Sequence, residues 1–324
     1  CEETMTTSQS AAGRVTIHPE SVGPLVVATA GPGAAAVIAA ARFLSGRLGA
    51  TPMVVAVHDP VFAYVPEVGM APLLPELEAE QREILREDVV GALRAAGGDA
   101  TSWTVAVTVG PPAPTIAHIA RERGARMIVM GIGRRAPLDR FFGAETTLRV
   151  MRLADQPVFA VVSEFAGPPA HVAVAIDFSA PSVLAAEEAL ALLGGGGGTL
   201  SLVHVRQTDR RTRRAADDSV REMYQRRVTD LFRRLRAMLT VPSSITVRDV
   251  VLEGDPAPEL VGFAEREGVD LIATGSSGMG FMDRLIVGSV ATQILRRSEV
   301  SVLAVPRPSP AEVQRIEREL VTRG

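Results

Sequence analysis

Glycine and serine residues at one spacing form the stretch of this sequence best suited to ligand chemistry. Gly275 and Gly278 follow the apolar run 271–274, and Gly288 and Ser289 come after nine intervening residues. Glycines without a Cβ let backbone N–H groups approach a ligand closely. Gly288 and Ser289 would add free N–H groups and a hydroxyl at a helix start, where the helix dipole favours an anion. The stretch therefore predicts a polyphosphate site.

The spacing of these residues, G-x2-G-x9-G-[S/T], resembles the ATP-binding motif of the universal stress protein family. It stands before a candidate helix and an apolar strand at 301–305, a context more specific than glycines that only form a turn. The resemblance implies that ATP is the ligand, with or without Mg²⁺. The site residues that it implies in this stretch are Gly275, Gly278, Gly288, Ser289 and Val290.

The elements that would position this motif occur twice, because the chain repeats itself at an offset of 144 residues. Residues 110–114, Gly-Pro-Pro-Ala-Pro, fall on residues 254–258, Gly-Asp-Pro-Ala-Pro, and Gly131 falls on Gly275. Eight of the 22 positions from 110 to 131 are identical at that offset. Such self-similarity indicates a duplicated unit.

Apolar runs alternate with amphipathic stretches in each unit. Strands are expected at 25–28, 53–57, 104–108, 127–130 and 158–162, and near 172–176, 200–205, 245–252, 271–274 and 301–305. Such alternation indicates a parallel sheet that helices cover on both faces. Right-handed crossovers then give an α/β fold of two tandem doubly wound domains, residues 13–163 and 171–308, each with a five-stranded parallel sheet. The family resemblance implies the adenine-nucleotide alpha-hydrolase-like version of this fold.

Ligands of such sheets lie beyond the carboxyl ends of the strands, where the strand order reverses. Ile176 and Asp177 follow the first strand of the second unit, and Val205 ends its second strand. The resemblance implies that Asp177 contacts the nucleoside and that Val205 lies near adenine. Two alternatives stay open: Asp177 caps the following helix, and Val205 is an ordinary core valine.

The first unit departs from this pattern. Its first strand runs into residues 29–33, Thr-Ala-Gly-Pro-Gly, without a carboxylate, and Arg134 stands in the place of Gly278. Ala144 and Glu145 replace the glycine and serine of the later motif, and a carboxylate there would repel phosphate groups. The sequence therefore predicts that only the second unit binds ATP.

Composition excludes several classes of protein. The chain has 324 residues, 47% of them hydrophobic, and a net charge of −3, which gives no basic field for nucleic acid. We find no apolar run of the roughly 18 residues that a membrane span needs. The single cysteine, Cys1, and the absence of an apolar signal core in residues 1–12 favour a cytoplasmic protein without disulfides.

Motifs for catalysis or metal binding are missing from the sequence: it has no Walker lysine loop, no GxSxG elbow and no Cys/His cluster. His58 and His204 each end a strand and are interpreted as ordinary strand-end imidazoles. We therefore expect no catalytic and no metal-ligating residues. The predicted function is an ATP-binding regulatory or stress-adaptation module with an unknown protein partner. The alternatives are an interaction scaffold without nucleotide and a slow ATPase using Asp283 and Arg284.

Three further stretches carry expectations about assembly and partners. The last strands, 157–162 and 301–306, lie at sheet edges, and the resemblance implies that they pair with each other within one chain. A higher homo-oligomer is compatible with this arrangement. The apolar loop 59–75 is expected to cover a pocket or an interface. The basic run 206–214 is expected to be a solvated face or to reach a phosphate or an acidic partner.

Overall fold

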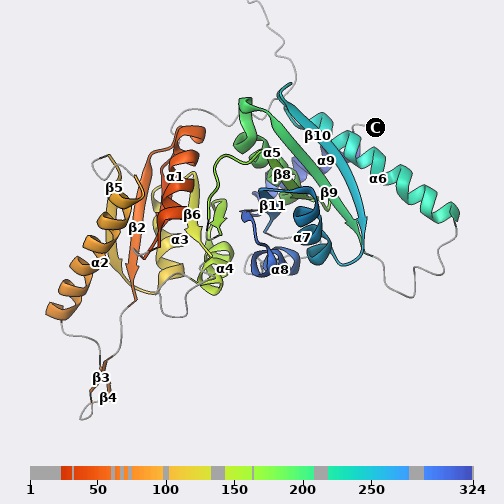
Figure 1. Ribbon diagram of the computed structural model, residues 1–324. Coiled ribbons are helices and arrows are strands. Elements are labelled where there is room, and N and C mark those ends of the chain that lie inside the picture. The colour runs from red at the N-terminus through yellow and green to blue at the C-terminus, as the bar shows by residue number, and fades with distance from the viewer. Residues whose placement is uncertain are drawn as a thin grey trace, which may run out of the picture.

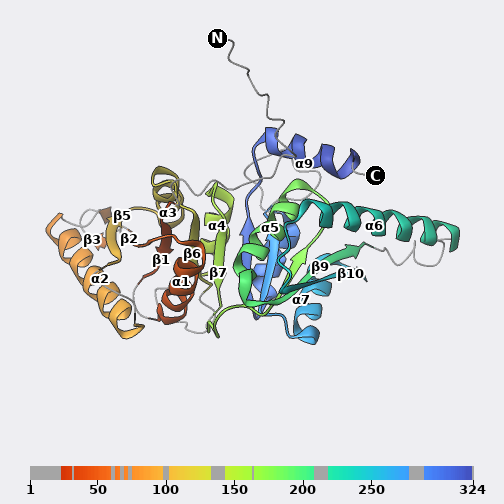
Figure 2. The same cartoon turned by 90° about the horizontal axis from the view of Figure 1, so that it is seen from above.

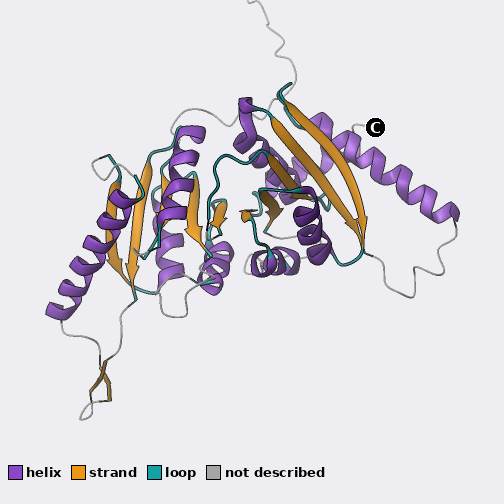
Figure 3. Cartoon of the chain, in the orientation of Figure 1, coloured by secondary structure: helices purple, strands orange, loops and turns teal. Residues whose placement is uncertain are grey.

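A computed structural model describes residues 23–30, 33–59, 63–65, 69–71, 75–97, 102–132, 143–162, 164–207, 218–276 and 288–322. Both repeats contribute strands to one long sheet, with helices packed along it (Figures 1 and 3). Gly278, Arg134, Asp283, Arg284 and most of the basic run lie outside the described residues.

The first repeat supplies one half of the sheet, in the order β5-β2-β1-β6-β7. Its parallel strands are β1 (Leu25–Ala28), β2 (Pro52–His58), β5 (Thr104–Val109), β6 (Met127–Gly131) and β7 (Val158–Val161). Its helices are α1 (Ala35–Leu48), α2 (Pro75–Ala95), α3 (Pro112–Glu122) and α4 (Ala144–Leu153). The strand order reverses between β1 and β6.

The second repeat has the same topology, in the order β10-β9-β8-β11-β12. Its parallel strands are β8 (His171–Ala175), β9 (Gly198–Arg206), β10 (Ile245–Glu253), β11 (Leu271–Gly275) and β12 (Ser301–Val305). Its helices are α5 (Ala180–Leu193), the 3-10 turn Gly194–Gly196, α6 (Asp218–Met238), α7 (Pro256–Glu267) and α8 (Ser289–Arg297). Here the order reverses between β8 and β11. The doubly wound α/β arrangement expected from the sequence is therefore present in both repeats.

Strands β7 and β12 join the two halves by antiparallel pairing into one ten-stranded sheet. Phe159 lies opposite Leu303, with Ala160 opposite Val302 and Val158 opposite Ala304. This confirms the predicted pairing of the last strands. Residue Phe159 corresponds to Leu303 at the repeat offset of 144. At the same offset, the pair Ala160–Val302 corresponds to the pair Ala304–Val158. The seam therefore has the register of an approximate twofold axis through the Phe159–Leu303 pair.

Alternate residues of each central strand enter two different cores, because helices cover both faces of the sheet. In β1, Leu25 and Val27 pack on one side, whereas Val26 and Ala28 pack on the other. Helices α1, α2, α5 and α6 contribute to the first core, and α3, α4, α7 and α8 to the second. Continuous apolar strands are what such double coverage requires. Within the described part of the chain, every helix falls short of the length or apolarity that a membrane crossing requires.

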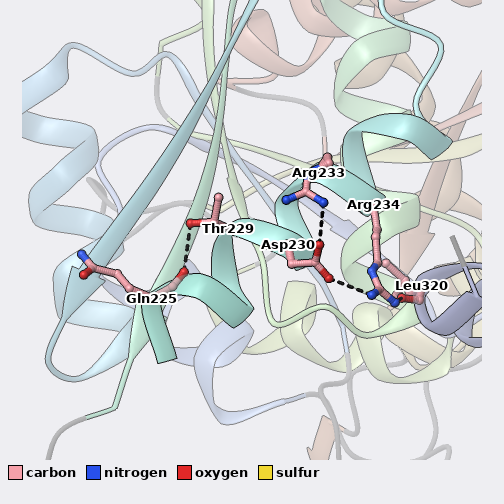
Figure 4. A network of polar contacts seen from close by, with 6 residues as sticks. All are labelled: Gln225, Thr229, Asp230, Arg233, Arg234 and Leu320. Atoms are coloured by element: carbon pink, nitrogen blue, oxygen red, sulfur yellow. Dashed lines mark hydrogen bonds and ion pairs between the residues drawn. The ribbon is translucent and has the colours of Figure 1, made fainter. Parts of the chain in front are cut away.

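A ninth helix, α9 (Pro310–Thr322), follows β12 and was not expected from the sequence. It lies beside α5 and α6, as the view from above shows (Figure 2). Its apolar residues Ile316 and Leu320 are buried in the first core. Arg234 of α6 donates to the carbonyl oxygen of Leu320 at 2.9 Å and pairs with Asp230 at 2.7 Å (Figure 4). The second repeat thus carries one helix beyond the duplicated unit.

The loop 59–75 contains a short hairpin of β3 (Ala63–Val65) and β4 (Gly69–Ala71), which pair antiparallel. The hairpin extends from the first repeat between β2 and α2 (Figure 1). The sequence predicted a single apolar loop here. Its role in covering a pocket or an interface stays a prediction.

Candidate functional site

A cavity of about 400 Å³ opens in the second repeat where the strand order reverses. Its walls come from the carboxyl ends of β8, β9 and β11 and from the first turns of α5, α7 and α8. The sequence-predicted residues that line it are Ile176, Asp177, Val205, Gly275, Gly288, Ser289 and Val290. Segments more than a hundred residues apart therefore meet at one place. Gly278, the remaining predicted residue, lies outside the described residues.

Asp177 is fixed at the start of α5. Its Oδ1 accepts a hydrogen bond from the Ser179 backbone N–H at 3.0 Å and another from the Ser179 hydroxyl. Ser179 is the N-cap residue of α5, and its carbonyl accepts a hydrogen bond from the Ser182 hydroxyl at 2.9 Å. The N-cap is therefore Ser179 and not Asp177, whose carboxylate instead holds the N-cap residue in place. The same carboxylate lines the cavity, so the two roles are compatible.

Phe178, between Asp177 and Ser179, turns the chain from β8 into α5. Its φ of 60° is the only positive value at a non-glycine residue in the described part of the chain. Such a conformation costs on the order of 1 kcal/mol or more and persists only where packing holds it. The centroid of the Phe178 ring lies 5.2 Å from that of the Phe232 ring and 5.0 Å from that of the His204 ring. This packing explains how the strained turn that presents Asp177 is maintained.

His204 has a partner for each ring nitrogen. Its Nδ1 lies 2.8 Å from the carbonyl oxygen of Ile176, and its Nε2 lies 2.8 Å from the Tyr224 hydroxyl. A carbonyl oxygen only accepts, so Nδ1–H donates, and in the neutral ring Nε2 accepts from Tyr224. Burial raises the pKa of the Tyr224 hydroxyl, against an opposing effect of Arg206. His204 is therefore a satisfied strand-end imidazole, as the sequence indicated.

Gly275 allows β11 and α5 to approach each other. A Cβ at this position would lie 2.7 Å from Cβ of Pro181 and 3.1 Å from its backbone carbon. Gly131 holds the same place in the first repeat, where a Cβ would lie 3.2 Å from Cγ2 of Val37. This glycine therefore has a packing reason in both repeats. At position 275 the glycine also leaves the cavity wall without a side chain, so that backbone atoms face the cavity.

The start of α8 differs from the sequence expectation in one respect. Gly288 is the N-cap, and its N–H donates to the carbonyl oxygen of Ser276 at 2.6 Å. The expectation of a free N–H at Gly288 was therefore wrong, because this N–H is hydrogen-bonded to the residue that follows β11. The N–H groups of Ser289, Val290 and Ala291 follow in the first turn, where a helix offers no internal acceptor. All three residues line the cavity, so this turn supplies backbone N–H donors to the cavity wall.

The corresponding helix of the first repeat is one residue longer. Helix α4 has ten residues after the N-cap Gly143, whereas α8 has nine residues after the N-cap Gly288. The extra residue is at the start of α4, because the buried residues Val150 and Met151 of α4 still match Ile294 and Leu295 of α8 at the repeat offset of 144. At that offset Ala144 and Glu145 stand in the places of Gly288 and Ser289, as in the sequence comparison. Glu145 lies in the first turn of α4, where it forms an ion pair of 3.3 Å with Arg296.

Sequence reasoning missed part of the cavity wall. Pro256 and Leu260, from the first turns of α7, line the cavity, as do Thr274 and Gln207. In the sequence, residues 254–258 are recognisable only as a repeated segment. Their place after the third strand of the repeat was a usable signal, because carboxyl strand ends meet at one edge of a parallel sheet.

Comparison with known proteins identifies the relatives of the chain. The model of the universal stress protein family matches residues 23–162 and 170–306. A universal stress protein of Mycobacterium tuberculosis strain H37Rv is 29% identical over 231 residues, which cover 70% of this chain and 77% of the relative. A universal stress protein of Methanocaldococcus jannaschii is 38% identical over 64 residues, 20% of this chain. The chain spans 38% of the length of that relative.

Among solved structures, a universal stress protein from Archaeoglobus fulgidus superposes with a TM-score of 0.59. The alignment covers 89% of this chain and 97% of that chain at 20% sequence identity. At this identity the likeness shows a shared fold.

Proposed function

We propose that this chain, which belongs to the universal stress protein family over both of its repeats, binds ATP in its second domain only, with or without Mg²⁺. It would act as a nucleotide-responsive module of stress adaptation, with a regulatory protein as its partner. The observation that carries the proposal is the cavity at the reversal of strand order, which gathers residues from the ends of β8, β9 and β11 and from the start of α8.

The chemistry of the cavity wall fits the three parts of a nucleotide. Val205 and Leu260 offer apolar surface to a base, and the Asp177 carboxylate offers an acceptor to ribose hydroxyls. The first turn of α8 offers backbone N–H groups and the Ser289 hydroxyl to phosphates. The volume of about 400 Å³ falls within the range of small-molecule sites. These features support a nucleotide better than an apolar ligand.

The first repeat supports no such fit. A carboxylate, Glu145, lies in the first turn of α4, and β1 continues into Thr29 rather than into an acidic residue. An anion at a helix start satisfies the helix dipole and would repel a phosphate. We therefore assign one nucleotide to each chain.

Calorimetric titration of the whole protein with ATP tests the proposal, with one site per chain as the expected result. Asp177→Asn should weaken binding about tenfold, because the neutral amide is a poorer acceptor for ribose hydroxyls. The amide oxygen can still accept from Ser179, so the start of α5 should be kept. Asp155→Asn, at an exposed carboxylate of the first repeat, is the matched control and should leave ATP binding unchanged.

Other outcomes of the titration distinguish the alternatives. Two equivalent sites per chain would contradict the assignment to the second domain. Absence of ATP binding at millimolar concentration would favour the interaction scaffold instead.

A further inference from the structure

Helices α4 and α8, from different repeats, pack against each other beside the β7–β12 seam (Figure 1). One ion pair links their ends. Arg296, the last residue but one of α8, lies 3.3 Å from Glu145, the second residue of α4. Helix α8 therefore directs a basic residue near its C-terminus toward the N-terminal turn of α4.

The twofold relation at the seam predicts a counterpart of this contact. Arg152 is the last residue but one of α4, as Arg296 is of α8. At the offset of 144 that relates the paired strands, Glu145 corresponds to Ser289, the first residue of α8. Exchanging the two repeats therefore converts the pair Arg296–Glu145 into the pair Arg152–Ser289. The symmetry thus sets the side chain of Arg152 near the first turn of α8.

The two ends of this helix pair differ in charge. At the start of α4, the cation Arg296 meets the carboxylate of Glu145. At the start of α8, the symmetry sets the cation Arg152 near Ser289, which has no charge and lines the cavity. No ion pair or hydrogen bond is found for the half-buried Arg152 among the described residues. Arg152 and the positive end of the α8 dipole therefore lie together without an anion from that part of the chain.

We propose that the anion completing this end is a terminal phosphate of the nucleotide, and that Arg152 of the first repeat binds it. The inference rests on the proposed function, because it assigns a residue to the same site. Glu145 then occupies in the first repeat the place that a phosphate takes in the second. A guanidinium suits this task because its planar fork of donors matches phosphate oxygens. The site would favour nucleoside triphosphates over monophosphates, and the ligand would contact both repeats.

Titration of the whole protein with ATP and with AMP, at low salt, tests this assignment. Arg152→Gln should weaken ATP binding about fivefold or more while changing AMP binding much less, because a charge-assisted contact to the terminal phosphates is lost. Arg152→Lys keeps the charge and should retain part of the affinity. Arg149→Gln, at an exposed arginine on the same helix, is the control and should change neither affinity.

Each other outcome has a separate meaning. Wild-type protein that binds neither nucleotide would overturn the proposed function, and this inference with it. Wild-type binding that Arg152→Gln leaves intact would overturn only the inference. Equal losses for ATP and AMP, or a lowered melting temperature of Arg152→Gln without ligand, would also overturn it, since Arg152 would then act through the shape of the site.

Discussion

Arg126 of the first repeat and Glu188 of the second form an ion pair at the domain interface. One guanidinium nitrogen donates to both carboxylate oxygens, at 2.9 and 2.7 Å. The two side chains are only 17% and 13% exposed. Arg126 precedes β6 and Glu188 lies on α5, so the contact fixes the first repeat to a helix of the second. It adds a charged contact to the strand pairing at the seam.

Removing one partner of this pair should be costly. Glu188→Ala leaves the guanidinium of Arg126 nearly buried without its carboxylate, and we expect a loss of about 2–3 kcal/mol in the free energy of unfolding. Asp155→Ala is the matched control, because its pair with Arg121 lies within one repeat and is more than half exposed on both sides. That change should cost about 1 kcal/mol or less. Urea unfolding measures both, and equal losses would contradict the prediction.

Gly275→Ala should lower stability by about 1–3 kcal/mol, because its Cβ would meet the backbone and ring of Pro181 at the start of α5. Gly131→Ala is the corresponding change in the first repeat and should cost less. There the nearest atom is Cγ2 of Val37, at 3.2 Å, which can move by rotation of its side chain. Thermal unfolding of the two variants compares them directly. A larger loss at position 131 would refute the packing argument.

The fold was largely predictable because repetition and apolar strands are local signals. The buried runs at β1, β6 and β11 read as strands directly, and shared glycines aligned the repeats from 110 to 131. Site residues at the carboxyl ends of strands followed from the topology alone, since parallel strands bring these ends together.

Contacts that depend on exact positions could not be predicted. The start of α4 is one example, because this helix begins one residue earlier than α8 relative to the repeat offset of 144. The hydrogen bond from Gly288 to the carbonyl oxygen of Ser276 is likewise a contact that sequence spacing cannot specify. Helix α9 was missed because it lies outside the repeat, so no matching segment indicated that Ile316 would be buried.

Glu187 on α5 predicts a pH dependence of stability. Burial raises the pKa of its carboxyl above the usual 4.5; Arg315 opposes the rise, and Glu188, Glu312 and Glu319 add to it. The stability that the neutral carboxyl contributes is present below its unfolded pKa and is lost as pH rises through the folded pKa. Glu187→Gln should therefore be more stable than wild type at about pH 7, with the advantage vanishing near about pH 4.

Urea unfolding at both pH values measures the Glu187 effect. Glu83→Gln, at an exposed carboxylate on α2, serves as the control and should show no pH-dependent gain. An advantage of Glu187→Gln that is equal at the two pH values would mean that the ionisation of Glu187 is not its cause.

Binding without turnover is the last expectation. Phosphoryl transfer to water needs a group that positions the water and cations that neutralise the developing charge. The titratable side chains among the described lining residues are Asp177 and His204. Asp177 accepts two hydrogen bonds from Ser179, and His204 is engaged on both ring nitrogens. Neither is well placed to act as a base. We therefore expect ATP to be retained, at a rate of hydrolysis far below about 1 per second.

Phosphate release by purified protein under saturating ATP measures this rate, with Asp283→Asn as the informative variant. Asp283 and Arg284 follow the glycine turn, but the first repeat has the same pair, Asp139 and Arg140, beside a degenerate motif. A pair present in both repeats is better explained by the shape of the segment than by catalysis. Steady release at about 1 per second or faster, lost in Asp283→Asn while ATP binding is preserved, would make the protein an ATPase.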